Sequence, residues 1–304
     1  ICESLGFARF LRPMAAAPAE LIEYARVRHV ADALLADLVP EDVGATPKAA
    51  AERTAVADGI LPAVHVFALG RGGVMVGERQ VSDIEWRSEK SKEMLFFLLA
   101  RKEPVAKEEI FAALWPDLSE SKCNSNFHSS LYRLRRAIFH ECVVRTASGS
   151  YELNPRGVFT ADVDAFNKAM LEADVARGED ARAAGLEEAI GHYKGPFLAS
   201  TYSEWVEPLR RELEDRYIEA LNELAAYRLR LGQFEEALTL FRLLEGVDPY
   251  SEAAAFGVMR CHVGLNDGPA AARHFRRFRQ LLKDELDEEP SPRLVELYRE
   301  ASAR

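Results

Sequence analysis

Hydrophobic residues alternate with polar ones near residue 64 and then recur every three or four positions. Residues 64–69 and 73–76 flank a Gly-Arg-Gly turn, and residues 77–81 continue the same strand pattern through another turn. Helical spacing follows over residues 88–100, 107–115 and 121–140, with the second helix stopped by Pro116. A second hairpin is expected from residues 142–146 and 151–153. Sheet, three helices and hairpin, in that order, predict a winged helix with an N-terminal sheet.

The chain from about residue 162 onwards is helical and repetitive. Leu231, Ala237, Phe241 and Leu244 recur 34 residues later as Leu265, Ala271, Phe275 and Phe278. That period is typical of tetratricopeptide-like helical hairpins. A weaker pattern around residues 189–197 suggests one more unit upstream.

The third predicted helix has two distinct faces. At 100° per residue, the apolar positions fall in one narrow arc, which we expect to pack against the two preceding helices; they are Phe127, Leu131, Leu134 and Ile138. The opposite face holds small polar residues first and arginines later, an order that suits a helix entering the major groove of DNA. Its members are Lys122, Ser125, Ser129, Tyr132, Arg133 and Arg136, with Asn126, His128 and Arg135 at the edges. A solvated arginine-rich face is the alternative interpretation.

Charge distribution supports the DNA interpretation although the net charge is −10. Residues 161–304 carry 19 Lys/Arg against 28 Asp/Glu, whereas residues 119–146 carry five basic and two acidic residues. The only concentration of basic charge that we identify in the sequence therefore coincides with the third helix and the hairpin. Within that hairpin, Arg145, Thr146 and Ser148 are the residues that we expect to reach phosphate or the minor groove.

Other chemistry is not indicated by the sequence. Its four cysteines show no zinc-binding spacing, and Asp162 and Asp164 look like residues of a helix start rather than a catalytic pair. We therefore expect no catalytic site, no metal and no cofactor. No apolar run approaches the length of a membrane span, and without a secretion signal we expect a cytoplasmic protein.

Several segments resemble one known family. They are VFALG at residues 66–70, EIFAALWP at 109–116, LYRLRRAI at 131–138, YKGPFL at 193–198 and LLKDEL at 281–286. The chain is similar to the SARP/AfsR-type bacterial transcriptional activators, in which an OmpR-like winged helix-turn-helix precedes a bacterial transcriptional activator domain. The resemblance implies binding of double-stranded DNA at promoter repeats, a homodimer on DNA, and recruitment of RNA polymerase through the loop before the third helix.

The expected fold class is mainly α with a small β component. We expect residues 1–39 to be a helical segment from the tail of an upstream domain, 40–62 a linker, 63–160 the winged helix, and 161–304 the helical-repeat domain. The expected function is sequence-specific activation of transcription without enzymatic activity. A helical-repeat adaptor whose winged helix makes protein contacts is the alternative.

Overall fold

The computed structural model describes residues 61–303, and residues 62–304 form one compact unit. The predicted helical segment 1–39 and nearly all of the predicted linker 40–62 lie outside the described residues.

The winged helix begins with a small sheet. β1 (Val64–Phe67), β2 (Gly73–Val76) and β3 (Arg79–Gln80) form an antiparallel meander, as the alternating pattern predicts. β6 (Phe159–Ala161) completes the sheet by pairing parallel to β1, giving the order β3-β2-β1-β6. The sequence pattern does not predict β6, because three residues are too few to show an alternation.

Helices cover the sheet and support a hairpin. They are α5 (Asp83–Trp86), α6 (Glu89–Arg101), α7 (Lys107–Leu114) and α8 (Glu120–Ala137). The last three confirm the predicted helices, although α8 ends three residues before the expected His140 because residues 139–142 form a turn with a bond from Cys142 N to Phe139 O of 3.1 Å. α5 was not predicted; Ser82 and Glu85 close a capping box at its start.

The predicted hairpin after α8 is present as the wing of the domain. β4 (Val143–Arg145) pairs antiparallel with β5 (Tyr151–Leu153). Val105 exchanges backbone hydrogen bonds with Tyr151 on the other side of β5, both of 2.8 Å. This third, one-residue strand ties the wing to the segment that leads into α7.

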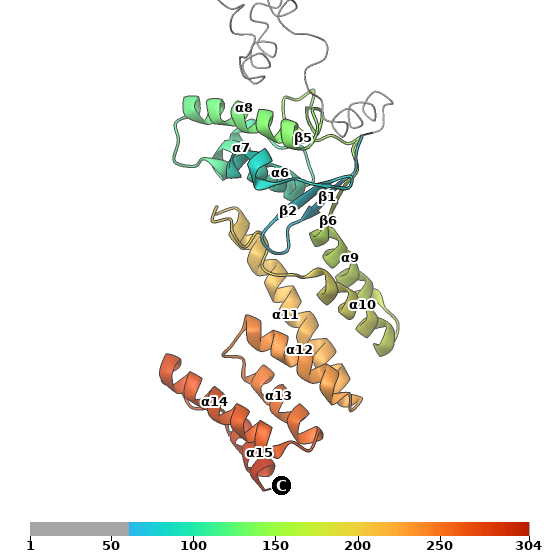
Figure 1. Ribbon diagram of the computed structural model, residues 1–304, viewed down its shortest axis with the longest axis vertical. Helices are drawn as coiled ribbons and strands as arrows, with labels where there is room; N and C mark the ends of the chain where they lie inside the picture. Colours follow the sequence, from blue (N-terminus) through green and yellow to red (C-terminus); the bar gives the residue numbers. More distant parts are fainter. Residues whose placement is uncertain (1–60, 304) are drawn as a thin grey trace, which may run out of the picture. The chain divides into compact units, whose positions relative to one another are not determined.

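The remaining chain is a series of antiparallel helical hairpins (Figure 1). The helices are α9 (Asp162–Val175), α10 (Glu179–His192), α11 (Val206–Arg230), α12 (Phe234–Val247), α13 (Glu252–Gly264), α14 (Gly268–Leu286) and α15 (Pro292–Ser302). Each packs on the next, and α11–α12 and α13–α14 are the two units of the 34-residue period. The weaker upstream pattern corresponds to α9–α10. Gly257 allows the close approach of α12 and α13, because a Cβ there would lie 2.4 Å from the Phe241 ring.

Asp162 joins the sheet to the first repeat helix. As expected of a helix-start residue, it lies in the first turn of α9. Its Oδ1 accepts from the backbone N–H groups of Ala68 (2.7 Å) and Val163 (2.9 Å), and its Oδ2 from that of Leu69 (2.9 Å). Burial raises the pKa of this carboxyl group, and the three hydrogen bonds act in the opposite direction. One carboxylate thus links the end of β1 to the start of the repeat.

A second joint is made by the segment between α10 and α11. Leu198 N donates to Ala68 O (2.8 Å) and Ala199 N to Gly70 O (2.7 Å), so this segment runs antiparallel to the chain that leaves β1. Trp205 Nε1 donates to the buried Glu93 carboxylate on α6 at 2.8 Å. The winged helix and the repeat are therefore packed together through hydrogen-bonded backbone and a buried carboxylate.

Candidate nucleic-acid interface

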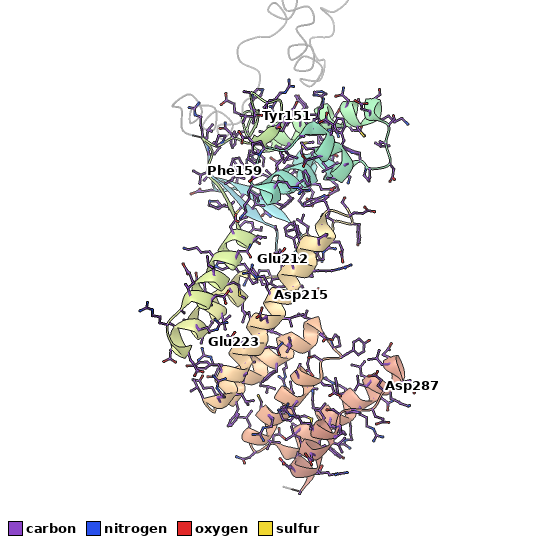
Figure 2. All side chains as sticks on the ribbon, turned by 180° about the vertical axis from the view of Figure 1, so that it is seen from behind. Tyr151, Phe159, Glu212, Asp215, Glu223 and Asp287 are labelled. Carbon is purple, nitrogen blue, oxygen red and sulfur yellow. The ribbon has the colours of Figure 1, made fainter. Side chains whose placement is uncertain are left out.

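One face of α8 is anchored in the core. Phe127, Leu131, Leu134 and Ile138 are all buried, as the sequence pattern predicts. Phe127 is fully buried, and its ring packs edge-on against Tyr151 of the wing, with centroids 4.8 Å apart (Tyr151 is labelled in Figure 2). Cys123, Ser130 and Ala137 extend the buried face. This packing fixes the rotation of α8 and determines which residues reach solvent.

The residues predicted to contact DNA lie on the opposite face. Exposed side chains are those of Lys122, Ser125, Asn126, His128, Ser129, Tyr132 and Arg136, whereas Arg133 and Arg135 are half-buried. Over the part of the chain that the structure describes, neither Arg133 nor Arg136 has an ion-pair partner. Two guanidinium groups about one helical turn apart are thus left available to a partner outside the chain.

Arg135 has a different environment from its neighbours. Its Nη2 donates to the backbone oxygen of Val143 in β4 at 2.7 Å, which connects the last turn of α8 to the wing. Arg79 of β3 makes a similar contact with the Ala137 carbonyl at 3.0 Å and also pairs with Glu85. Such bonds satisfy carbonyl groups that have no partner inside the helix or the hairpin.

Lys107 is a residue of this surface that the sequence pattern does not single out. It is the first residue of α7, and its ammonium group contacts Asn124 and lies 3.4 Å from His128 Nε2. The same group lies 5.1 Å from the centroid of the Phe127 ring. The local sequence does not show that Lys107 belongs to this surface, because only folding brings the start of α7 beside the first half of α8.

The wing turn holds the predicted Arg145, Thr146 and Ser148. The Thr146 and Ser148 hydroxyls are 2.8 Å apart, and Arg145 Nε donates to Gly149 O at 3.3 Å. Gly149 has φ of +92°, a conformation that a side chain would strain. The turn is therefore ordered by its own hydrogen bonds, with the Arg145 side chain exposed on its strand.

Within residues 61–303, no group of His, Cys, Asp and Glu side chains could hold a metal ion. Cys142 lies fully buried beneath the wing, and burial raises the pKa of its thiol to about 12. Its position is that of a core residue. Trp115 is also buried. Among the helices described, none is long and apolar enough to cross a membrane.

Comparison with known proteins identifies the second half of the chain. The sequence of residues 161–301 matches the bacterial transcriptional activator domain family. This match confirms, over residues 161–301, the resemblance to SARP-type regulators seen in the sequence.

A structural comparison extends the likeness to the winged helix. The chain is similar to EmbR of Mycobacterium tuberculosis, solved in complex with a low-affinity phosphopeptide, with a TM-score of 0.59 and 19% sequence identity. The match covers 80% of this chain and 65% of the EmbR chain. At this identity the likeness shows a common fold, and this chain spans about two thirds of the length of its neighbour. The comparison with curated proteins found no match.

Proposed function

We propose that this chain is a sequence-specific DNA-binding activator of transcription. In this proposal it binds promoter repeats through α8 and the wing and recruits RNA polymerase, with the bacterial transcriptional activator domain mediating dimerisation or regulation. The observation that carries the proposal is the pairing of a fully anchored face of α8 with an opposite face whose arginines have no ion-pair partner among the described residues.

The dimensions and chemistry of α8 suit the major groove. The helix has 18 residues and so spans about 27 Å, and it presents Ser125 and Ser129 in its N-terminal half. Small hydroxyl side chains allow a helix to approach base edges, while Arg133 and Arg136 have the reach for guanine or phosphate. The wing would then approach the adjacent backbone with Arg145, Thr146 and Ser148.

The loop between α7 and α8 supports the proposed contact with RNA polymerase. Asp117 and Leu118 are exposed in this loop, and Leu118 is 37% exposed although it is a large apolar residue. On the buried side of the loop, the Cys123 thiol shares its hydrogen between the carbonyl groups of Trp115 (3.5 Å) and Leu118 (3.4 Å). A loop that is held in one conformation and presents an apolar side chain loses little entropy when a partner binds it.

Selection of bound sequences from random DNA tests the proposal. We expect enrichment of one short motif in direct repeat, and footprinting of the selected DNA should show protection at the spacing of those repeats. Affinity should fall steeply as salt is raised, because each phosphate contact releases condensed counterions. Enrichment of no sequence, together with salt-independent or absent DNA binding, would falsify the proposal and favour the adaptor whose winged helix contacts protein.

A further inference from the structure

A second concentration of basic residues lies on α14, and it is visible in the sequence itself. Residues 268–283 contain four arginines and one lysine but no acidic residue. Arg279 pairs with Glu289 at 2.8 Å, and Lys283 pairs with Asp287. Arg273 and Arg276 are exposed, and across the described range neither has an ion-pair partner. The prediction that basic charge is concentrated only near α8 is therefore wrong.

The neighbouring helices extend this basic surface. Arg277 is three-quarters exposed and reaches Glu245 of α12 only at 3.7 Å. Arg242 of α12 and Arg273 of α14 both act on His262 of α13, whose pKa is lowered first by burial and then by these nearby charges, against the effect of Asp267. α12 and α14 both pack on α13, so arginines of two helices lie near one histidine. We define the basic face as Arg242, Arg273, Arg276 and Arg277.

An acidic counterpart lies on α11. Glu212, Asp215 and Glu219 follow the spacing i, i+3, i+7, so they occupy one side of the helix, and all three are exposed. Figure 2 labels Glu212 and Asp215 on this helix. Throughout the described residues, none of the three forms an ion pair. Acidic residues of the neighbouring α10 do have partners, such as Glu179 with Arg230 and Glu187 with Arg228. We call these three residues the acidic stripe.

The acidic stripe lies on α11 and three of the four arginines of the basic face lie on α14, and these two helices are not neighbours in the series. α12 and α13 lie between α11 and α14 in the series of packed helices. We propose that the acidic stripe of one copy binds the basic face of a second copy, head to tail. The inference rests on the dimer of the proposed function and names the surfaces that form it. Charge complementarity carries it: the two sets are exposed and opposite in sign. Among the described residues the acidic stripe forms no ion pair, and in the basic face only Arg277 forms one, with Glu245 at 3.7 Å.

Such a contact has a defined physical character. It is heterologous, because the two copies use different surfaces, and this geometry suits proteins bound in the same direction on direct repeats. Exposed ion pairs are individually weak and are screened by salt. The contact is therefore transient in free solution and becomes effective when DNA holds two copies close together.

Sedimentation velocity without DNA tests the contact, with the full chain compared at about 20 mM and about 300 mM salt, where the Debye length falls roughly from 20 to 6 Å. We expect self-association at the low salt concentration only. The basic-face variant Arg273→Glu with Arg276→Glu, and the acidic-stripe variant Asp215→Arg with Glu219→Arg, should each remain monomeric. Because each variant then carries two surfaces of one sign, an equimolar mixture of the two should associate again. Glu235→Arg with Glu236→Arg on α12 makes the same change in charge outside the stripe and should leave association unchanged.

Association of the two variants in the equimolar mixture, together with the α12 control, distinguishes a specific contact from a general effect of charge. If it stays monomeric, or if the α12 control abolishes association as fully as the stripe variant, the head-to-tail contact is excluded. Association with an acidic protein but not with a second copy would also overturn it. Circular dichroism should show unchanged helicity in each variant, and the milder Arg273→Gln with Arg276→Gln should weaken association less than the reversal.

The assay contains no DNA, so its outcome is independent of the proposed function. In turn, if the chain binds DNA, both variants should keep their affinity for one selected site. On two adjacent sites they should lose about tenfold in cooperative binding, a typical coupling between bound copies.

Discussion

Arg136 on α8 and Arg230 on α11 are both exposed arginines in the last turn of a helix, but their surroundings differ. Arg230 donates to Glu179 of α10 at 2.7 Å, and Arg228 to Glu187 at 3.0 Å. In the described part of the chain, Arg136 has no ion pair. The repeat domain uses these arginines to connect one hairpin to the next, whereas the winged helix leaves two arginines available beside an anchored core.

The largest expected effect is the loss of stability when a buried phenylalanine is removed from the core of either region. Phe127→Ala removes a fully buried ring beneath α8, and Phe166→Ala removes one from α9. Each should lower the free energy of unfolding by about 3–5 kcal/mol, the usual cost of truncating a buried phenylalanine. Urea unfolding followed by circular dichroism measures both. Because residues 62–304 form one compact unit, we expect a single transition in each variant. Two separate transitions within one variant, with only one of them shifted, would show that the regions fold independently.

The second effect separates the two kinds of arginine. Arg133→Ala with Arg136→Ala should weaken binding to the selected DNA about 100-fold, roughly 2.7 kcal/mol, because base or phosphate interactions are removed. The slope of log affinity against log salt should fall by about one for each phosphate that is no longer bound. Fluorescence anisotropy at several salt concentrations gives both quantities.

Arg228→Ala with Arg230→Ala is the matched control for that experiment. It removes the same number of positive charges from α11 and should leave DNA affinity within about twofold, since its ion pairs hold helices together at an exposed surface. Equal losses in the two double variants would mean that net charge, rather than the face of α8, controls binding.

The sequence predicts some of these features much better than others. The three helices of the winged helix, the wing and the 34-residue period are readable because each repeats a pattern over many residues, and the structure confirms them. β6 and the joint at Leu198 are not readable, since they depend on pairing with β1 and its following residues. Lys107 and the acidic stripe on α11 also depend on what lies beside them in space.

The candidate site shows the same division. The exposed or buried side of α8 follows from helical period alone. Whether an exposed arginine has a partner does not, because the partner comes from another element: Val143 for Arg135, Glu179 for Arg230. The set of DNA-contacting residues therefore stays a prediction, which the structure sharpens by showing which guanidinium groups are already used.

The third effect concerns the joint between the two regions. Asp162→Asn keeps the size of the side chain but replaces one acceptor oxygen with an N–H donor, which cannot bind the backbone N–H of Leu69 or Ala68. A buried donor left without its acceptor costs about 1–3 kcal/mol in unfolding free energy. Differential scanning calorimetry should show a lower melting temperature with one transition retained. Asp164→Asn on the same helix is the control, because its side chain is half-exposed and its ion pair with Lys102 is a surface pair that contributes little.

The smallest effect divides neighbouring arginines on α8 itself. Arg135→Ala should cost about 1 kcal/mol of stability, the net value of one hydrogen bond, because it releases the Val143 carbonyl of the wing. Arg136→Ala should leave stability within about 0.5 kcal/mol, as is usual for exposed positions without such a feature. Binding to the selected DNA should rank the other way, with the larger loss in Arg136→Ala. If Arg135→Ala loses affinity at unchanged stability, Arg135 reaches DNA directly and its bond to the wing is broken in the complex.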